Sequence, residues 1–137
     1  MNTRTVTKTA ATIALAATAA FGAAAPAMAG NTCKNVAIEF TNDTGGKIKI
    51  VDIDYWDPAK GRNGGWRSIY VRNEKLSPGV TWDETRNLRR VNQRQTKLRI
   101  EYRLPGKHFG WRLKKHKVIS DSFVCSRRDS VELSTSD

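Results

Sequence analysis

The chain is poor in the residues on which catalysis and metal binding most often depend. It contains only two histidines and two cysteines among 137 residues, so few groups can transfer protons near neutral pH or bind a soft metal. No Gly-x-Ser-x-Gly, Ser-x-x-Lys or phosphate-binding glycine loop occurs. Neither His108 nor His116 belongs to a zinc-protease motif. We therefore expect no cofactor and no enzymatic activity.

Acidic residues are scarce relative to basic ones, with 13 Asp and Glu against 24 Lys and Arg. The first 29 residues hold two of the bases, Arg4 and Lys8, and no acid, so the remaining 108 residues have a net charge of +9. A basic domain of this size attracts anionic partners such as nucleic acid, lipid head groups, acidic glycans or an acidic protein.

Long apolar runs are missing beyond the amino terminus. The one such run, Ala10 to Ala25, is shorter than the roughly 20 residues of a transmembrane helix. It follows Arg4 and Lys8 and precedes the small-x-small motif that ends at Ala29. This layout predicts a cleavable signal peptide over residues 1–29, and the alternative is an uncleaved anchor. We expect a single extracytoplasmic domain over residues 30–137, periplasmic or secreted.

The two cysteines lie near the two ends of that domain. Cys33 and Cys125 are 92 positions apart and belong to no Cys-x-x-Cys motif. In an oxidising compartment an even pair predicts a disulfide, here one that ties the first strand to the last. The alternatives are a reactive thiol and a metal ligand.

Alternation of apolar and polar residues runs through most of the domain and predicts β-strands. The clearest strand is Thr96 to Leu104. Residues 36–40 and 47–53 alternate on either side of an Asn-Asp-Thr-Gly-Gly turn and are expected to form a hairpin, with a bulge near Ile50–Val51. Phe109 to Leu113 is expected to return beside Thr96 to Leu104 across Pro105–Gly106.

In all, seven to nine short strands separated by turns, and no long helix, are expected. This pattern is typical of a small antiparallel β-sandwich, with a Greek-key barrel as the alternative.

A basic face is the first candidate site. Lysines and arginines occupy the outward positions of the predicted strands 96–104 and 109–114, and more of them lie in the connection before these strands. The candidate residues are Lys97, Arg99, Arg103, Arg112, Lys114, Arg86, Arg89, Arg90 and Arg94. Such a surface suits an anionic polymer, and the alternative interpretation is an ordinary solvated sheet face.

Tryptophans flank the glycine-rich loop of residues 57–65. Trp56 and Trp66 could stack on a ligand or belong to the core. Trp82 and Trp111 are expected in the core.

An acidic segment precedes the same loop. Asp52, Asp54 and Asp57 could bind Ca²⁺ through oxygen ligands, but their spacing does not match an EF-hand. We expect ion pairs with neighbouring Lys or Arg instead, and no metal site.

These features favour a non-catalytic binding module for an anionic polymer, an envelope surface or an acidic protein. An inhibitor or immunity protein against a secreted enzyme or toxin is the alternative. The third hypothesis is a small secreted nuclease that uses Glu84, Glu101 and His108 beside the arginines.

Overall fold

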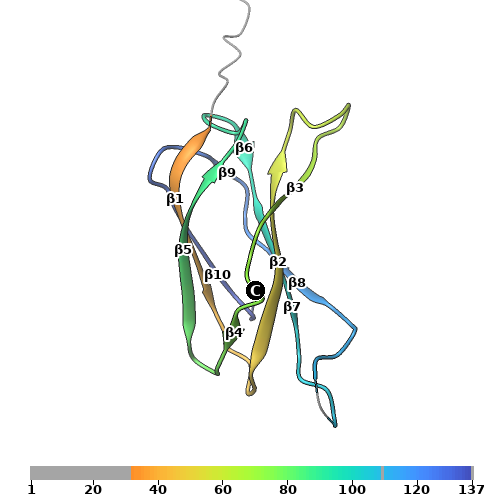
Figure 1. Cartoon of the computed structure of the whole chain (residues 1–137). Helices are drawn as coiled ribbons and strands as arrows, with labels where there is room; N and C mark the ends of the chain where they lie inside the picture. The colour runs from red at the N-terminus through yellow and green to blue at the C-terminus, as the bar shows by residue number, and fades with distance from the viewer. Residues whose placement is uncertain (1–31, 109, 137) are drawn as a thin grey trace, which may run out of the picture.

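The computed structural model describes residues 32–108 and 110–136, and these residues form ten β-strands and no helix (Figure 1). Within them, no helix is long and apolar enough to cross a bilayer. The predicted signal peptide, residues 1–29, and Phe109 lie outside the described residues. The predicted all-β architecture is confirmed.

The smaller of the two main sheets has three strands in the order β10-β1-β5. Its central strand β1 (Cys33–Thr41) runs antiparallel to β5 (Thr81–Leu88) and parallel to β10 (Ser130–Ser134). The parallel pair departs from the fully antiparallel pattern that the sequence predicted. A parallel partner requires a long connection between its strands, and 88 residues separate Thr41 from Ser130 in this chain.

The larger sheet has the order β3-β2-β7-β8, with β4 paired to the first part of β2. Its register shifts between Ile50 and Asp52, which confirms the predicted bulge. A separate two-stranded sheet joins β6 to β9. The strands of these two sheets are β2 (Ile48–Asp57), β3 (Gly65–Ile69), β4 (Lys75–Leu76), β6 (Gln95–Thr96), β7 (Leu98–Arg103), β8 (His116–Ile119) and β9 (Phe123–Val124).

The predicted hairpin between residues 36–40 and 47–53 is wrong, because β1 and β2 belong to different sheets. The turn between them is built around Asn42, which is fully buried. The side-chain Nδ2 atom of Asn42 donates to the backbone carbonyl oxygens of Gly46, at 2.9 Å, and of Leu76, at 3.1 Å. These bonds stabilise the turn through which the chain passes from the smaller sheet to the larger one. The turn residues alone do not show whether the two flanking strands pair with each other.

The hydrophobic core draws on both main sheets. One buried cluster combines apolar side chains of β1, such as Ile38 and Phe40, with those of β2 and β7, such as Ile53 and Ile100. Figure 1 shows the smaller sheet on the left and the larger on the right. Full burial of one such side chain stabilises the fold by about 1.5–3 kcal/mol.

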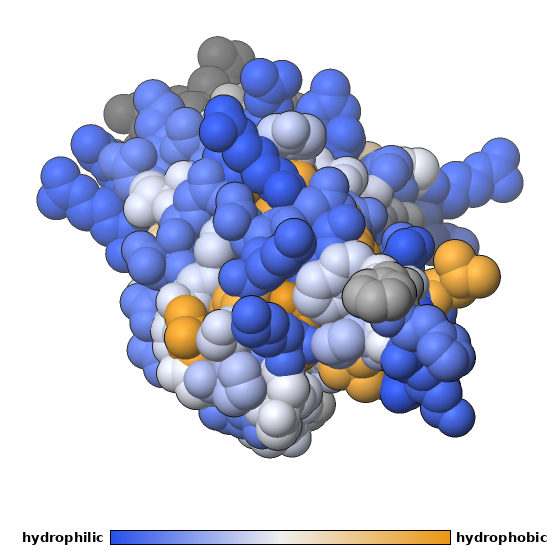
Figure 2. All heavy atoms as spheres, turned by 60° about the horizontal axis from the view of Figure 1, so that its bottom comes forward, coloured by the Kyte–Doolittle hydropathy of each residue, from blue (hydrophilic) through white to orange (hydrophobic). Residues whose placement is uncertain are grey.

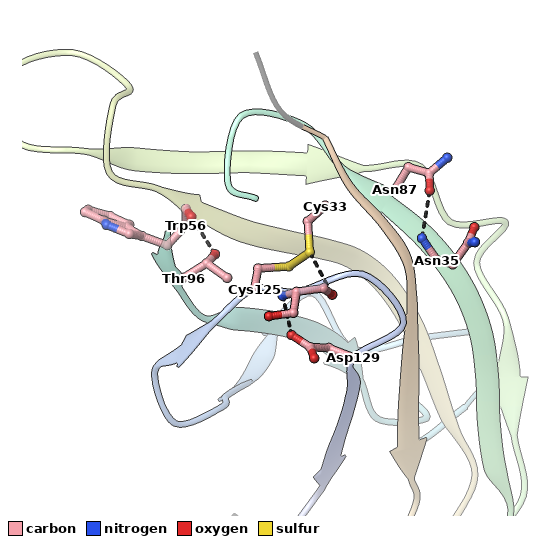
Figure 3. Close-up of a disulfide and its surroundings, with 8 residues drawn as sticks. Cys33, Asn35, Trp56, Asn87, Thr96, Cys125 and Asp129 are labelled. Atoms are coloured by element: carbon pink, nitrogen blue, oxygen red, sulfur yellow. Dashed lines mark hydrogen bonds between the residues drawn. A yellow bond between two sulfur atoms is a disulfide. The ribbon is translucent and has the colours of Figure 1, made fainter. Parts of the chain in front are cut away.

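The predicted disulfide between Cys33 and Cys125 is confirmed (Figure 3). Both cysteines are fully buried. The bond joins the start of β1 to the residue that directly follows β9. It therefore links the smaller main sheet to the two-stranded sheet.

The strand that returns beside β7 is β8, and not the predicted segment 109–113. Between β7 and β8, the described residues of the stretch 104–115 form a connection with one isolated bridge, between Pro105 and Trp111. Pro105 has no N–H to continue the ladder of β7. Arg112 and Lys114 consequently lie in this connection, and not on the sheet surface on which the sequence analysis placed them.

Strand β5 extends further than the sequence predicted. It continues through Leu88, so Arg86 is a strand residue and not part of the following connection. The connection itself begins at Arg89, as two successive turns before β6.

Candidate functional site

The predicted basic residues divide between two ends of the molecule. In the β2–β7 pair, Leu98 lies opposite Tyr55 at one end and Arg103 lies opposite Lys49 at the other. The first end also holds the disulfide, and we call it the disulfide end. It comprises residues 57–67, 89–97 and 125–129 together with Lys34. Of the predicted site, it contains Arg89, Arg90, Arg94, Lys97 and Trp66.

The opposite end contains three of the other predicted residues: Arg103, Arg112 and Lys114. Arg103 ends β7, and Arg112 and Lys114 follow in the 104–115 connection. Trp56 and Arg99 lie on strands beside the disulfide end, and Arg86 lies on β5. The structure thus splits the predicted face into two cationic regions.

Hydrogen bonds and the disulfide hold the segments of the disulfide end together. Gln93 N donates to Cys125 O at 2.8 Å, and Cys125 N donates to Arg94 O at 3.0 Å. Arg128 N donates to Lys34 O at 3.0 Å. The hydroxyl of Thr96 donates to Trp56 O at 2.6 Å, beside the disulfide in Figure 3. These segments therefore form one platform.

Ten cations and only two acids lie on this platform. The acids are both engaged: Asp57 accepts from Arg67 at 2.6 Å, and Asp129 accepts from Ser126 N at 2.5 Å. The cations are Lys34, Lys60, Arg62, Arg67, Arg89, Arg90, Arg94, Lys97, Arg127 and Arg128. The surplus makes the disulfide end strongly electropositive.

Three turn residues of the platform have left-handed backbone conformations. The φ angles are 67° at Arg90, 57° at Gln93 and 69° at Arg128. Such conformations are uncommon for residues other than glycine and Asn or Asp, and they cost about 1 kcal/mol or more. Two of the exposed turn cations are therefore carried at positions where glycine would fit with less strain.

A pocket of about 420 Å³ opens beside the platform. Tyr55 lies in its wall, and burial raises the pKa of this phenol, while a hydrogen bond with the Arg89 backbone and the charge of Arg67 act in the opposite direction. Lys60 donates from Nζ to the carbonyl oxygen of Trp66. The lining residues are Tyr55, Lys60, Arg67, Ser68, Ile69, Asn87 and Arg89.

Trp56 and Trp66 lie on neighbouring strands and pack edge to face, with ring centroids 5.5 Å apart. Lys97 Nζ lies 5.5 and 5.6 Å from the two centroids, and the Arg99 guanidinium lies 4.4 Å from that of Trp66. Both rings are half-buried. They therefore belong to a cation–π cluster, and part of each ring is accessible.

Arg99, like Arg86, is a predicted site residue that an acid already binds. Its Nη2 and Nε atoms donate to the same Asp54 oxygen at 2.6 and 3.0 Å. The expected ion pairing of the acidic segment is thus confirmed for Asp54 with Arg99 and for Asp57 with Arg67. Asp52 instead accepts a hydrogen bond from the Ser68 hydroxyl at 2.8 Å.

One group of three metal-ligand side chains lies close together among the described residues: Cys33, Cys125 and Asp129. Both sulfurs belong to the disulfide, so they cannot act as thiolate ligands. The alternative Ca²⁺ residues Asp52, Asp54 and Asp57 do not form such a group.

The tryptophans that were expected in the core are only partly there. Trp82 packs against the buried cluster and is partly buried, whereas Trp111 is half-buried in the 104–115 connection. Trp111 lies in a connection and not on the predicted strand, so its side chain is less buried than expected.

The two main sheets carry oppositely charged rows on their outer faces, which sequence reasoning missed. On the larger sheet, Lys49 lies directly opposite both Lys75 and Arg103. On the smaller sheet, Glu39 lies opposite Asp83 and Glu132. Residues in register on neighbouring strands share a face. Only the strand register reveals these rows, since their members are far apart in sequence.

The residues considered for a nuclease come from separate elements. Glu84 on β5 pairs with Arg86 at 2.6 Å, and Glu101 on β7 pairs with Lys115 at 2.7 Å. His108 lies in the 104–115 connection, and His116 stacks on Tyr102 with ring centroids 5.4 Å apart. Each carboxylate already holds a cation.

No protein-family model matches the chain, and searches of curated proteins and of solved structures found no match either. Its function is therefore inferred from its own residues.

Proposed function

We propose that the chain is an extracytoplasmic, non-catalytic binding module that holds an anionic polymer at its disulfide end. One observation carries the proposal: the platform combines ten cations with two acids, both of which are already engaged. Anionic polymers bind such surfaces by releasing counterions, which makes the affinity strongly dependent on salt.

The strained turns support the same proposal. Glycine would relieve the backbone at Arg90 and Arg128, yet both positions carry an exposed cation. Backbone strain that persists at a site is a pointer to function. A charged ligand that contacts both side chains gives a reason for their presence.

The turns of the platform are held in place by covalent and hydrogen bonds. The disulfide and the backbone bonds around Cys125 fix the turns before a ligand arrives, and such preorganisation lowers the entropy lost on binding. We further propose that the two main sheets pack face to face as a β-sandwich, since one buried cluster draws on both. The disulfide is compatible with the extracytoplasmic location that the amino-terminal sequence predicts.

Heparin chromatography tests the proposal. The variant Arg90→Gly/Arg128→Gly removes two platform cations while relieving strain, so its salt slope on heparin should fall by about two relative to the unmodified protein. Its free energy of unfolding should be unchanged or higher by up to about 1 kcal/mol.

The matched control is Lys47→Gln/Arg72→Gln, which removes two exposed cations outside the platform. Equal losses in both variants would mean that net charge alone drives retention and would contradict the platform. Capture of a single protein partner with little salt dependence would favour the inhibitor hypothesis instead.

A further inference from the structure

A second cationic region lies at the opposite end of the molecule and includes an exposed apolar side chain. Between Glu101 and Asp121 the sequence contains no acid. Leu113 lies within this stretch and is 88% exposed, the most exposed of the large hydrophobic residues in the described chain. The cations of this stretch are Arg103, Lys107, Arg112, Lys114, Lys115 and Lys117.

The connection that carries Leu113 projects below the body of the molecule (Figure 1). Backbone bonds brace its base: Arg112 N donates to Leu104 O at 2.9 Å, and Gly106 N donates to Gly110 O at 2.9 Å. Arg112 Nε also donates to Pro105 O at 3.1 Å. These bonds fix the base of the connection, while residues 112–115 are exposed. Figure 2 faces this end, where hydrophilic surface surrounds isolated hydrophobic patches.

The base of the projection carries the row of like charges on the larger sheet. Like charges directly opposite one another destabilise a sheet. Lys49 on β2 lies directly opposite Lys75 on β4 and Arg103 on β7. Arg103 Nε is buried and has no hydrogen-bond partner among the described residues. An anion bound from outside would relieve the repulsion between these side chains.

The outer face of the smaller sheet has the opposite charge. Its row of Asp83, Glu39 and Glu132 would be repelled by a negative surface. The molecule would therefore meet such a surface with the 104–115 connection and turn its acidic face away.

We propose that the segment Trp111–Lys115, together with Lys107, docks on an anionic lipid surface. Leu113 and Trp111 enter the head-group region, while Lys107, Arg112 and Lys114 pair with lipid phosphates, and Lys115 remains paired with Glu101. Cations beside exposed apolar and aromatic side chains are the arrangement that binds lipid interfaces, whereas a soluble polyanion would need the cations alone. The inference goes beyond the proposed function, because it assigns a separate site at the other end of the molecule.

Co-sedimentation with vesicles tests this inference, using the full chain expressed in an export-competent host and purified in its processed form. The protein should bind phosphatidylglycerol vesicles at low salt and not phosphatidylcholine vesicles. Leu113→Ser should weaken vesicle binding about ten-fold, because it removes the buried apolar area. Lys107→Gln/Lys114→Gln should weaken it by a similar factor or more, because each cation near the surface contributes.

Val124→Ser provides the matched control, since Val124 is an exposed apolar residue outside the connection, and it should bind vesicles like the unmodified protein. If Leu113→Ser binds as well as the unmodified protein, the lipid site is refuted and the vesicle acts only as a polyanion. Absent vesicle binding with normal heparin retention would overturn this inference and leave the proposed function standing. Loss of heparin retention in Arg90→Gly/Arg128→Gly with normal vesicle binding would confirm that the two sites are separate.

Discussion

At the scale of single residues, Tyr55 links the core to the proposed platform. Burial raises the pKa of its phenol above the ordinary value of 10.0, and burial does the same for Tyr102. A raised pKa means that the folded state favours the neutral phenol more than the unfolded state does. This stabilisation is fully present below pH 10.0 and is lost as the pH rises through the folded-state pKa values.

The free energy of unfolding should therefore fall between about pH 9 and about pH 11. Tyr55→Phe removes one of the two groups and should make the fall smaller. Denaturant titration at both pH values measures the difference, and Tyr70→Phe is the control because Tyr70 is 77% exposed. An equal pH dependence in all three proteins would show that Tyr55 ionises alike in the folded and unfolded states.

The ion pair between Arg99 and Asp54 yields a second prediction at this scale. The side chains are 21% and 6% exposed, so Arg99→Ala would leave a nearly buried carboxylate without its partner. We expect a loss of about 2–3 kcal/mol in the free energy of unfolding. The more exposed pair of Glu84 and Arg86 supplies the comparison, and Glu84→Gln should cost less than about 1 kcal/mol.

A double-mutant cycle separates the pair from its surroundings. Asp54→Ala/Arg99→Ala should cost less than the sum of the single changes, because the double variant leaves no unpaired charge. Strict additivity would mean that the two side chains contribute independently. Arg99→Ala would then act mainly through its contact with Trp66.

At the scale of elements, the disulfide should contribute much of the stability. Its cysteines are 92 positions apart, and closing a loop of that length restricts the unfolded chain by about 4–5 kcal/mol in the chain-entropy model. Cys33→Ser/Cys125→Ser should lose a comparable amount in chemical unfolding. Thiol titration of the unmodified protein without reductant should find no reactive cysteine. A double serine variant of unchanged stability would contradict this role.

The elements also show what the sequence could and could not predict. The strand predicted over residues 96–104 is confirmed over Leu98–Arg103, whereas Thr96 belongs to β6. The bulge near Ile50 and the disulfide, which follow from local alternation and from residue chemistry, are also confirmed. The partners of each strand cannot be predicted from local alternation, because strands that pair are often far apart in sequence. Strand β1, for example, pairs with β5 and β10 and not with β2. Arg112 and Lys114 were misplaced for the same reason, since alternation in the sequence continues past Arg103, where β7 ends.

At the scale of the whole molecule, charge is separated more clearly than composition alone could indicate. The net charge of +9 beyond residue 29 divides between the disulfide end and the 104–115 connection, while the acidic row occupies the smaller sheet. Of the ten platform cations, the sequence analysis named four, which are Arg89, Arg90, Arg94 and Lys97. It joined them into one surface because it lacked the antiparallel register of β2 and β7, which sends Arg103 and Leu98 to opposite ends.

The parallel pairing of β1 with β10 also bears on the order in which the molecule assembles. Strand β1 needs β10 as a partner on one edge, and Cys33 needs Cys125 to form the disulfide. A chain that is synthesised from its amino terminus cannot pair the second edge of β1 until β10 is available. For the same reason, it cannot form the disulfide until Cys125 is available. The fold is therefore completed late in synthesis, once residues 125–134 are available.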